Sequence, residues 1–179
     1  NKRMEKETPK LSFGIISSRD FFLKLETEYD DFDKNSISAR HAINCALTSW
    51  HMTDWTFHEF FAHLPEYTDK SKLIDKEDFK ILKTISGLTL YQDSLIKNCN
   101  ELKYMRLVAN GSKHCILRNS QIKEKTVLYS GDFAFEDYDR RDFDVDRFQI
   151  LNDNGDIIDF EDTLLKTIDF WRAYIKDLI

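Results

Sequence analysis

The amino-acid sequence predicts a mainly α fold, a helical bundle with a small antiparallel β element inserted before the last helix. The chain has 179 residues with only 5 Gly and 2 Pro, so few positions interrupt helices. Apolar residues recur at helical spacing over most of the chain. Between about 122 and 158 the pattern changes to short β-type runs separated by Gly and Asp clusters. These observations predict a single helical domain over 11–179, with residues 1–10 as a flexible lead-in.

Two helices are expected in the first third of the chain. Ser18 can cap the first, which is expected to end at about Tyr29, before an Asp-rich loop. Ser36 opens the second and longest helix, which runs to about Leu64, where Pro65 stops it. The apolar residues of this second helix form a stripe at the i, i+3, i+4, i+7 spacing of a packed helix: Ile43, Ala46, Leu47, Trp50, Phe57 and Phe61.

The rest of the chain alternates between helical and β-type patterns. Three shorter helices are expected at 76–85, 88–97 and 102–114. Short β-type runs follow at 126–129, 133–135 and 148–151. The pair Asn154-Gly155 lies between two apolar runs and predicts a hairpin, because both residues accept positive φ. Helical spacing returns over 162–178.

Composition narrows the classes of function. The net charge of −6 argues against a generic nucleic-acid coat, although it leaves room for a local basic site. The three cysteines are far apart and form no CxxC pair, so neither a disulfide framework nor a structural zinc site is expected. No apolar stretch reaches about 18 residues, and no signal peptide is visible. We therefore expect a cytoplasmic protein with no membrane partner.

The segment from Arg106 to His114 carries the most promising chemistry. On a continuous helix, Asn110 lies about 40° from Arg106, Lys113 about −20° and His114 about 80°, so all four share one face. Arg and Lys side chains hold phosphate through charge-assisted hydrogen bonds, and His transfers protons near neutral pH. Metal-free RNA cleavage needs these parts: a base, cations for the developing negative charge, and a proton donor.

The same segment has a structural explanation. Asn110-Gly111 can form the end of a helix, because Gly readily adopts the left-handed cap conformation. Lys113 and His114 would then lie near the last carbonyl groups, where positive charge is favoured by the helix dipole. Continuity of the helix through Gly111 decides between the two interpretations.

An Arg and a His spaced along a late helix of an α bundle resemble the HEPN superfamily. Its members include metal-independent ribonucleases, often dimeric, in toxin–antitoxin and phage-defence systems, with an Arg-x(4–6)-His motif. The resemblance implies that Arg106 and His114 are catalytic, that Asn110 and Lys113 bind substrate, and that RNA or a nucleotide is the ligand. It also implies that no cofactor is needed and that the protein forms a homodimer. Seven residues separate Arg106 from His114 here, one more than the motif allows, and Leu107 replaces a polar residue.

The chain also resembles uncharacterised bacterial and phage helical proteins. The shared features are a Trp-His-x-x-Asp-Trp helix, here Trp50–Trp55, and an Asn-Gly-x-Lys-His helix end, here 110–114. This second resemblance implies no activity.

Two alternatives remain open from the sequence. His51, Asp54 and His58 lie one turn apart along the second helix and could present metal ligands for a metal-dependent enzyme, if a second helix completed the shell. The other alternative is a non-enzymatic bundle that binds a partner protein, because Phe, Tyr and Trp are favoured at interfaces and 136–146 is strongly acidic.

Overall fold

The computed structural model describes residues 13–76, 79–113, 124–129 and 146–179. These residues form five α-helices, a two-stranded hairpin and a three-stranded antiparallel sheet that precedes the last helix. The predicted fold class, mainly α with a small antiparallel β element before the last helix, is confirmed. The expected flexible lead-in 1–10 and the β-type run 133–135 lie outside the described residues.

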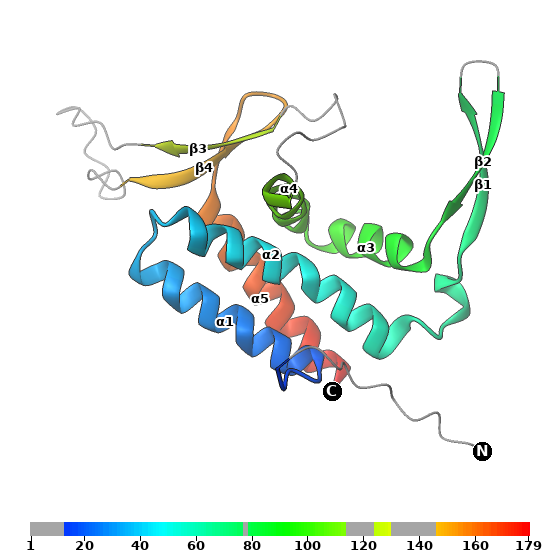
Figure 1. Cartoon of the computed structure of the whole chain (residues 1–179), viewed down its shortest axis with the longest axis horizontal. Helices are drawn as coiled ribbons and strands as arrows, with labels where there is room; N and C mark the ends of the chain where they lie inside the picture. The colour runs from blue at the N-terminus through cyan, green and yellow to red at the C-terminus, as the bar shows by residue number, and fades with distance from the viewer. Residues whose placement is uncertain (1–12, 77–78, 114–123, 130–145) are drawn as a thin grey trace.

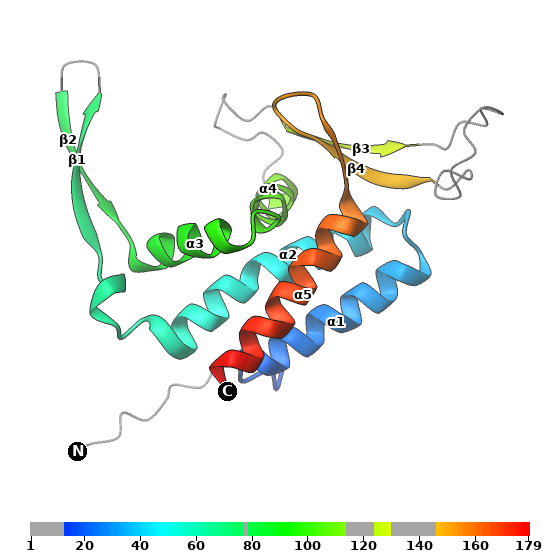
Figure 2. The ribbon, with the colours of Figure 1, turned by 180° about the vertical axis from the view of Figure 1, so that it is seen from behind.

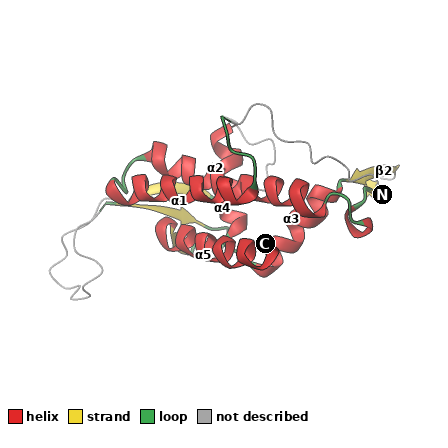
Figure 3. Ribbon diagram, turned by 90° about the horizontal axis from the view of Figure 1, so that it is seen from below, coloured by secondary structure: helices red, strands yellow, loops and turns green. Residues whose placement is uncertain are grey.

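Helices α1 (Ser18–Lys34) and α2 (Ala39–Thr56) lie side by side, and α5 (Phe160–Leu178) packs against both on one side (Figures 1 and 3). Helix α4 (Leu102–Lys113) packs against α2 and is seen nearly end-on in Figure 1. Trp171 of α5 is fully buried, and its indole Nε1–H donates to the Ser49 carbonyl of α2 at 3.1 Å. The Ser49 hydroxyl donates in turn to Thr167 Oγ1 at 3.3 Å. These hydrogen bonds fix the buried face of α5 against α2.

Helix α1 differs from its predicted bounds at both ends. Its N-cap is Ser17, whose hydroxyl accepts from the Asp20 N–H at 3.1 Å, rather than Ser18. The helix continues to Lys34, so the expectation of a loop after Tyr29 was wrong. Phe32 explains the extension, because its buried ring packs edge-on against Phe160 of α5 at 5.6 Å. Tertiary packing of this kind supplies most helix stability in proteins.

Helix α2 begins after the Ser38 N-cap, two residues later than predicted. Its α-helical part ends at Thr56 rather than near Leu64, and the chain continues as a π-helical turn, Phe57–Phe61. This turn places Phe57 and Phe61 against Tyr91, with ring centroids 5.6 and 4.9 Å away. A short 3₁₀ turn, Pro65–Tyr67, follows.

A β-hairpin stands where sequence periodicity predicted a helix over 76–85. Strands β1 (Lys70–Lys76) and β2 (Phe79–Ile85) pair antiparallel and extend away from the helices (Figures 1 and 2). Leu73 is registered with Leu82, and Ile74 with Ile81. Helical spacing over 76–85 did not indicate the hairpin, because the strand that pairs with this segment lies before it in the chain, outside the window that showed this spacing.

The remaining elements follow the predictions closely. Helices α3 (Gly87–Asn98), α4 and α5 occupy the expected positions, and α5 is capped by Asp159. Strands β3 (Lys125–Tyr129), β4 (Arg147–Leu151) and β5 (Ile157–Asp159) form the sheet in the order β3-β4-β5. The predicted hairpin joins β4 to β5, and Gly155 has the positive φ of +84° that this turn requires.

Candidate functional site

Helix α4 is continuous through the Asn110-Gly111 pair and ends at Lys113. Among the described glycines only Gly14 and Gly155 have positive φ, so Gly111 is not a left-handed cap. The interpretation that places the helix end at Asn110-Gly111 is therefore wrong. Arg106, Asn110 and Lys113 fall within about 60° around the helix axis, as a continuous helix requires. His114 lies outside the described residues.

Arg106 is held over the neighbouring helix. Its guanidinium carbon lies 5.5 Å from the centroid of the Trp50 ring of α2, within range of a cation–π contact. Nη1 lies 4.0 Å from Oδ1 of Asp93 on α3. The Arg106 side chain nevertheless keeps 43% of its surface exposed. These contacts orient the guanidinium while leaving it accessible to a ligand.

His51 directly follows Trp50 in α2, lies one turn before Asp54, and is exposed at the surface. Partial desolvation lowers the pKa of His51 below its ordinary value of 6.5, although Asp54 acts to raise this pKa. The positive charges of Lys24 and Lys113 also lower the pKa of His51. Since Lys24 belongs to α1 and Lys113 to α4, His51 lies in the combined field of two neighbouring helices.

Lys24 is fixed by hydrogen bonds from its ammonium group. Nζ donates to Oγ1 of Thr48 on α2 at 2.6 Å and to Oε1 of Glu28 on α1 at 2.9 Å. Its positive charge therefore stays at the α1/α2 boundary.

We call this region the α2/α4 basic surface and define it by Lys24, Trp50, His51, Arg106, Asn110 and Lys113. Helix α4 itself contains three cations, Lys103, Arg106 and Lys113, and no carboxylate, in a chain whose net charge is −6. Asn110 and Lys113 are exposed. The surface can hold an anion on α4 beside an imidazole whose neutral form is favoured.

The structure does not bring His51, Asp54 and His58 together as a metal site. Nε2 of His58 lies 3.7 Å from Oδ1 of Asp54, and both side chains are exposed. Within the described ranges, no three His, Cys, Asp or Glu side chains are grouped so that they could hold a metal ion. Seven residues place His51 about 10 Å from His58 along the helix axis. The adjacent helix α4 presents cations where a metal shell would need carboxylates.

The sequence predicted that Arg106, Asn110 and Lys113 share a face and singled out His51, but it did not indicate three of their neighbours. Lys24, Trp50 and Asp93 come from α1, α2 and α3, so their contribution depends on how the helices pack. Periodicity placed Trp50 in the core, where it is indeed buried. No local signal indicated that Arg106 would lie over its ring.

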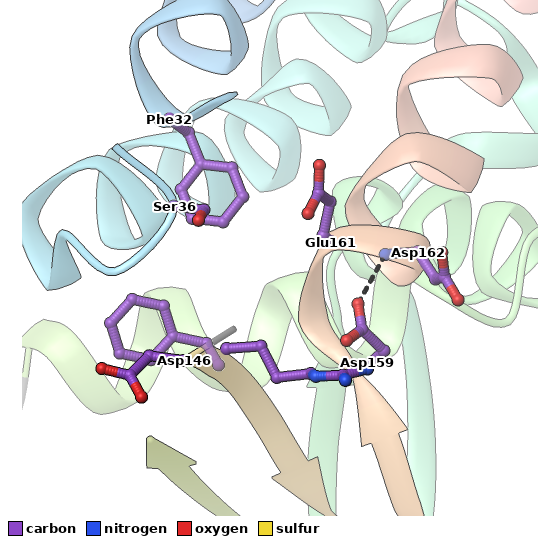
Figure 4. A pocket seen from close by; sticks show the side chains of 8 residues that line it. Phe32, Ser36, Asp146, Asp159, Glu161 and Asp162 are labelled. Atoms are coloured by element: carbon purple, nitrogen blue, oxygen red, sulfur yellow. Dashed lines mark hydrogen bonds between the residues drawn. The ribbon is translucent and has the colours of Figure 1, made fainter. Parts of the chain in front are cut away.

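A separate cavity of about 520 Å³ lies where the end of α1, the start of β4 and the start of α5 meet (Figure 4). Carboxylates of Asp146, Asp159, Glu161 and Asp162 line it, together with Arg147 and the rings of Phe32 and Phe148. Burial raises the pKa of Glu161, and the Tyr29 hydroxyl donates to its Oε1 at 3.3 Å. This cavity includes no residue of the α2/α4 basic surface, and its carboxylates disfavour an anionic ligand.

Comparisons with protein-family models, with curated proteins and with solved structures find no match to this chain. Among the helices of the described ranges, none combines the length and the apolar character needed to cross a membrane.

Proposed function

We propose that this protein binds RNA on the α2/α4 basic surface and cleaves it without a metal ion, as a HEPN-like endoribonuclease. One observation carries the proposal: α4 is continuous, so Arg106, Asn110 and Lys113 share one face of it. Helix α4 meets α2 where Arg106 lies over Trp50, and the charge of Lys113 contributes to the lowered pKa of His51. Arg and Lys bind phosphate, and a neutral imidazole among cations can accept a proton. This combination supports phosphoester chemistry better than metal catalysis.

The proposed reaction is transfer of the phosphoryl group to the neighbouring 2′-hydroxyl of RNA. A neutral histidine removes the 2′-hydroxyl proton while the 2′-oxygen attacks phosphorus. The bond from phosphorus to the 5′-oxygen breaks, and a protonated group supplies a proton to that leaving oxygen. His51 is assigned the role of base. His114 is assigned the role of acid through the sequence resemblance.

The cations of α4 have a separate role in this proposal. Arg106 and Lys113 stabilise the negative charge that develops on the phosphoryl oxygens, and Asn110 orients the phosphate. Because Arg106 is already held over the Trp50 ring, little side-chain freedom is lost when it binds a phosphate. The biological setting proposed with this activity is a defence or toxin system.

The experiment measures binding and cleavage of a labelled single-stranded RNA in buffer containing EDTA. Arg106→Ala and Lys113→Gln are expected to weaken binding about tenfold or more, because hydrogen bonds to charged groups are among the strongest. His51→Gln and His114→Ala are expected to abolish cleavage while retaining binding. Lys34→Gln on α1, a lysine that is 73% exposed, is the control.

Several outcomes would overturn the proposal. If the wild-type protein binds no RNA at low salt, the proposal is wrong and the alternative of a protein-binding bundle is favoured. Cleavage that persists in His51→Gln removes the assigned base. Circular dichroism of each variant must match the wild type, so that loss of activity reports the site rather than the fold.

A further inference from the structure

The β1–β2 hairpin carries a concentration of lysines. Its two strands together contain five lysines and one aspartate, in a chain whose net charge is −6. Three of the lysines, Lys70, Lys72 and Lys83, belong to the half of the hairpin that adjoins the helices. The carboxylates of the segment come further along it, at Asp75 and at positions 77–78. The half of the hairpin nearest the helices is therefore basic.

The strand register places these three lysines on one face of the hairpin. Lys72 is paired with Lys83, and Lys70 shares the face of Lys72 because successive residues of a strand alternate between faces. Residues directly opposite each other have Cβ atoms about 4.5–5.5 Å apart, and diagonal neighbours about 7–8 Å. Lysine is a compact point charge on a flexible stem, so three lysines at this spacing can bind neighbouring phosphates.

The base of the hairpin has a defined position on the helices. Oδ1 of Asp69, the residue before β1, accepts the N–H of Gly87, the first residue of α3, at 2.9 Å. A Cβ at Gly87 would collide with the carbonyl oxygen of Tyr67, so the chain before β1 lies directly against the start of α3. These contacts hold together the two ends of the hairpin, where the three lysines lie.

The hairpin projects away from the helices (Figures 1 and 2), and within the described ranges its strands pair only with each other. Seven residues per strand give it a length of about 20 Å. A two-stranded hairpin is marginally stable, and the Lys72–Lys83 pair weakens it further because like charges repel. Lysine on an exposed strand edge discourages aggregation, but that role does not require two lysines opposite each other. A bound anion would offset their repulsion.

We propose that the three-lysine face of the hairpin, defined by Lys70, Lys72 and Lys83, binds the phosphate backbone of RNA. The hairpin contains no residue of the α2/α4 basic surface, so the inference goes beyond the proposed function and shares with it only the ligand. A polyanion suits a projecting arm because its phosphates repeat along the chain. Contacts to phosphate carry no sequence information, so the hairpin adds affinity rather than base preference.

The test replaces Lys70, Lys72 and Lys83 together by Gln and measures binding of a labelled 2′-O-methyl oligouridylate by fluorescence anisotropy. The 2′-O-methyl group blocks the proposed cleavage, so that binding alone is observed. The triple variant is expected to bind about tenfold more weakly or worse at low salt. The slope of log affinity against log salt concentration should become shallower by about 2, because each phosphate contact to a single strand contributes about 0.7.

Two matched variants serve as controls. Replacement of Lys34, Lys166 and Lys176 by Gln removes the same charge from exposed positions of α1 and α5 and is expected to leave the salt slope unchanged. Replacement of the three hairpin lysines by Arg keeps the charges and is expected to retain binding. Removing the Lys72–Lys83 repulsion does not weaken the hairpin, so lost binding in the Gln variant is not explained by unfolding.

The outcomes separate this inference from the proposed function. Equal RNA affinity in the hairpin and control Gln variants overturns the inference, since only net charge would then matter. Unchanged RNA affinity with a loss of self-association in sedimentation would assign the lysines to a second copy of this chain and also overturns it. Weakened binding in the hairpin variant, with no effect of Arg106→Ala or Lys113→Gln, supports the inference while removing the proposed site.

Discussion

The guanidinium of Arg106 lies over the Trp50 ring, with its central carbon 5.5 Å from the ring centroid. This contact joins the face of α4 that carries Arg106, Asn110 and Lys113 to α2, in which His51 directly follows Trp50. The Trp50 side chain is itself buried, so its ring gives the guanidinium a fixed platform. Helices α2 and α4 are therefore in contact at Arg106.

Removing the carboxylate that competes for Arg106 is expected to strengthen RNA binding. Asp93→Asn takes away the negative charge 4.0 Å from the guanidinium and should raise RNA affinity about twofold to fivefold, as for other exposed ion pairs. Titration by fluorescence anisotropy measures the effect. Asp177→Asn, at an exposed position of α5, changes the net charge equally. An equal gain in both variants would show that only net charge matters.

The lowered pKa of His51 is expected to depend on the positive charges of Lys24 and Lys113. Lys24→Gln and Lys113→Gln should each raise the pKa of His51, because each removes a positive charge that disfavours the imidazolium. Proton NMR titration of the imidazole follows this change, with Lys34→Gln as the control. If Lys113→Gln left the pKa of His51 unchanged, Lys113 of α4 would lie too far from His51 to influence it.

The same lowered pKa predicts how stability depends on pH. The unfolded chain binds a proton at His51 more readily than the folded chain, since its pKa has the ordinary value of 6.5. The contribution of His51 to folding stability is therefore complete above pH 6.5 and is lost as pH falls through the folded-state pKa. Urea unfolding at several pH values should show a weaker dependence in this acidic range for His51→Gln than for the wild type.

Two glycines at helical positions are expected to respond in opposite ways to alanine. A Cβ at Gly87 would collide with the backbone carbonyl of Tyr67, so Gly87→Ala should lower the free energy of unfolding by about 1–3 kcal/mol. Gly111→Ala meets open space within α4 and should raise this free energy by about 0.5–1 kcal/mol. Urea denaturation followed by circular dichroism compares them. Equal effects would contradict the close approach of Tyr67 to α3.

Substitution of Trp171 is expected to lower the free energy of unfolding more than substitution of Trp55. Trp171→Phe removes the indole donor to the Ser49 carbonyl and leaves a small void, which should cost about 1–3 kcal/mol. Trp55→Phe keeps an aromatic ring against Phe21, where the present centroid distance is 4.9 Å, and should cost less than about 1 kcal/mol. Chemical denaturation of the two variants measures the difference, and a reversed order would contradict the assigned core.

Two buried thiols are expected to resist alkylation. Burial raises the pKa of Cys45 to about 12 and that of Cys99 to about 11, so little reactive thiolate forms near pH 8. In a Cys115→Ser background, iodoacetamide should label neither Cys45 nor Cys99 in the folded protein, and should label both in guanidinium chloride. Mass spectrometry counts the labels. Rapid labelling of the folded protein would show that one of these thiols is accessible.

Local patterns in the sequence predicted the elements that depend on local geometry. Helices α3 and α4 lie where 3.6-residue spacing placed them, and the stripe on α4 follows from that spacing. The β1–β2 hairpin was missed because its pairing joins residues outside a helical window. The extension of α1 depends on Phe32 meeting Phe160 from the far end of the chain. Likewise, the arrangement of Lys24, Trp50 and Asp93 around the candidate site depends on packing between helices, which periodicity does not encode.

The hydrogen bond from the Trp171 indole to the Ser49 carbonyl affects the order in which the helices can fold. Its partners are 122 residues apart in the chain. While the protein is being synthesised, α1 and α2 emerge early but lack the side chain that fills their shared core. Until α5 is available, the apolar faces of these helices remain exposed to water and to other nascent chains. Closing so long a loop is entropically unfavourable, so docking of α5 should be the slow, cooperative step of folding.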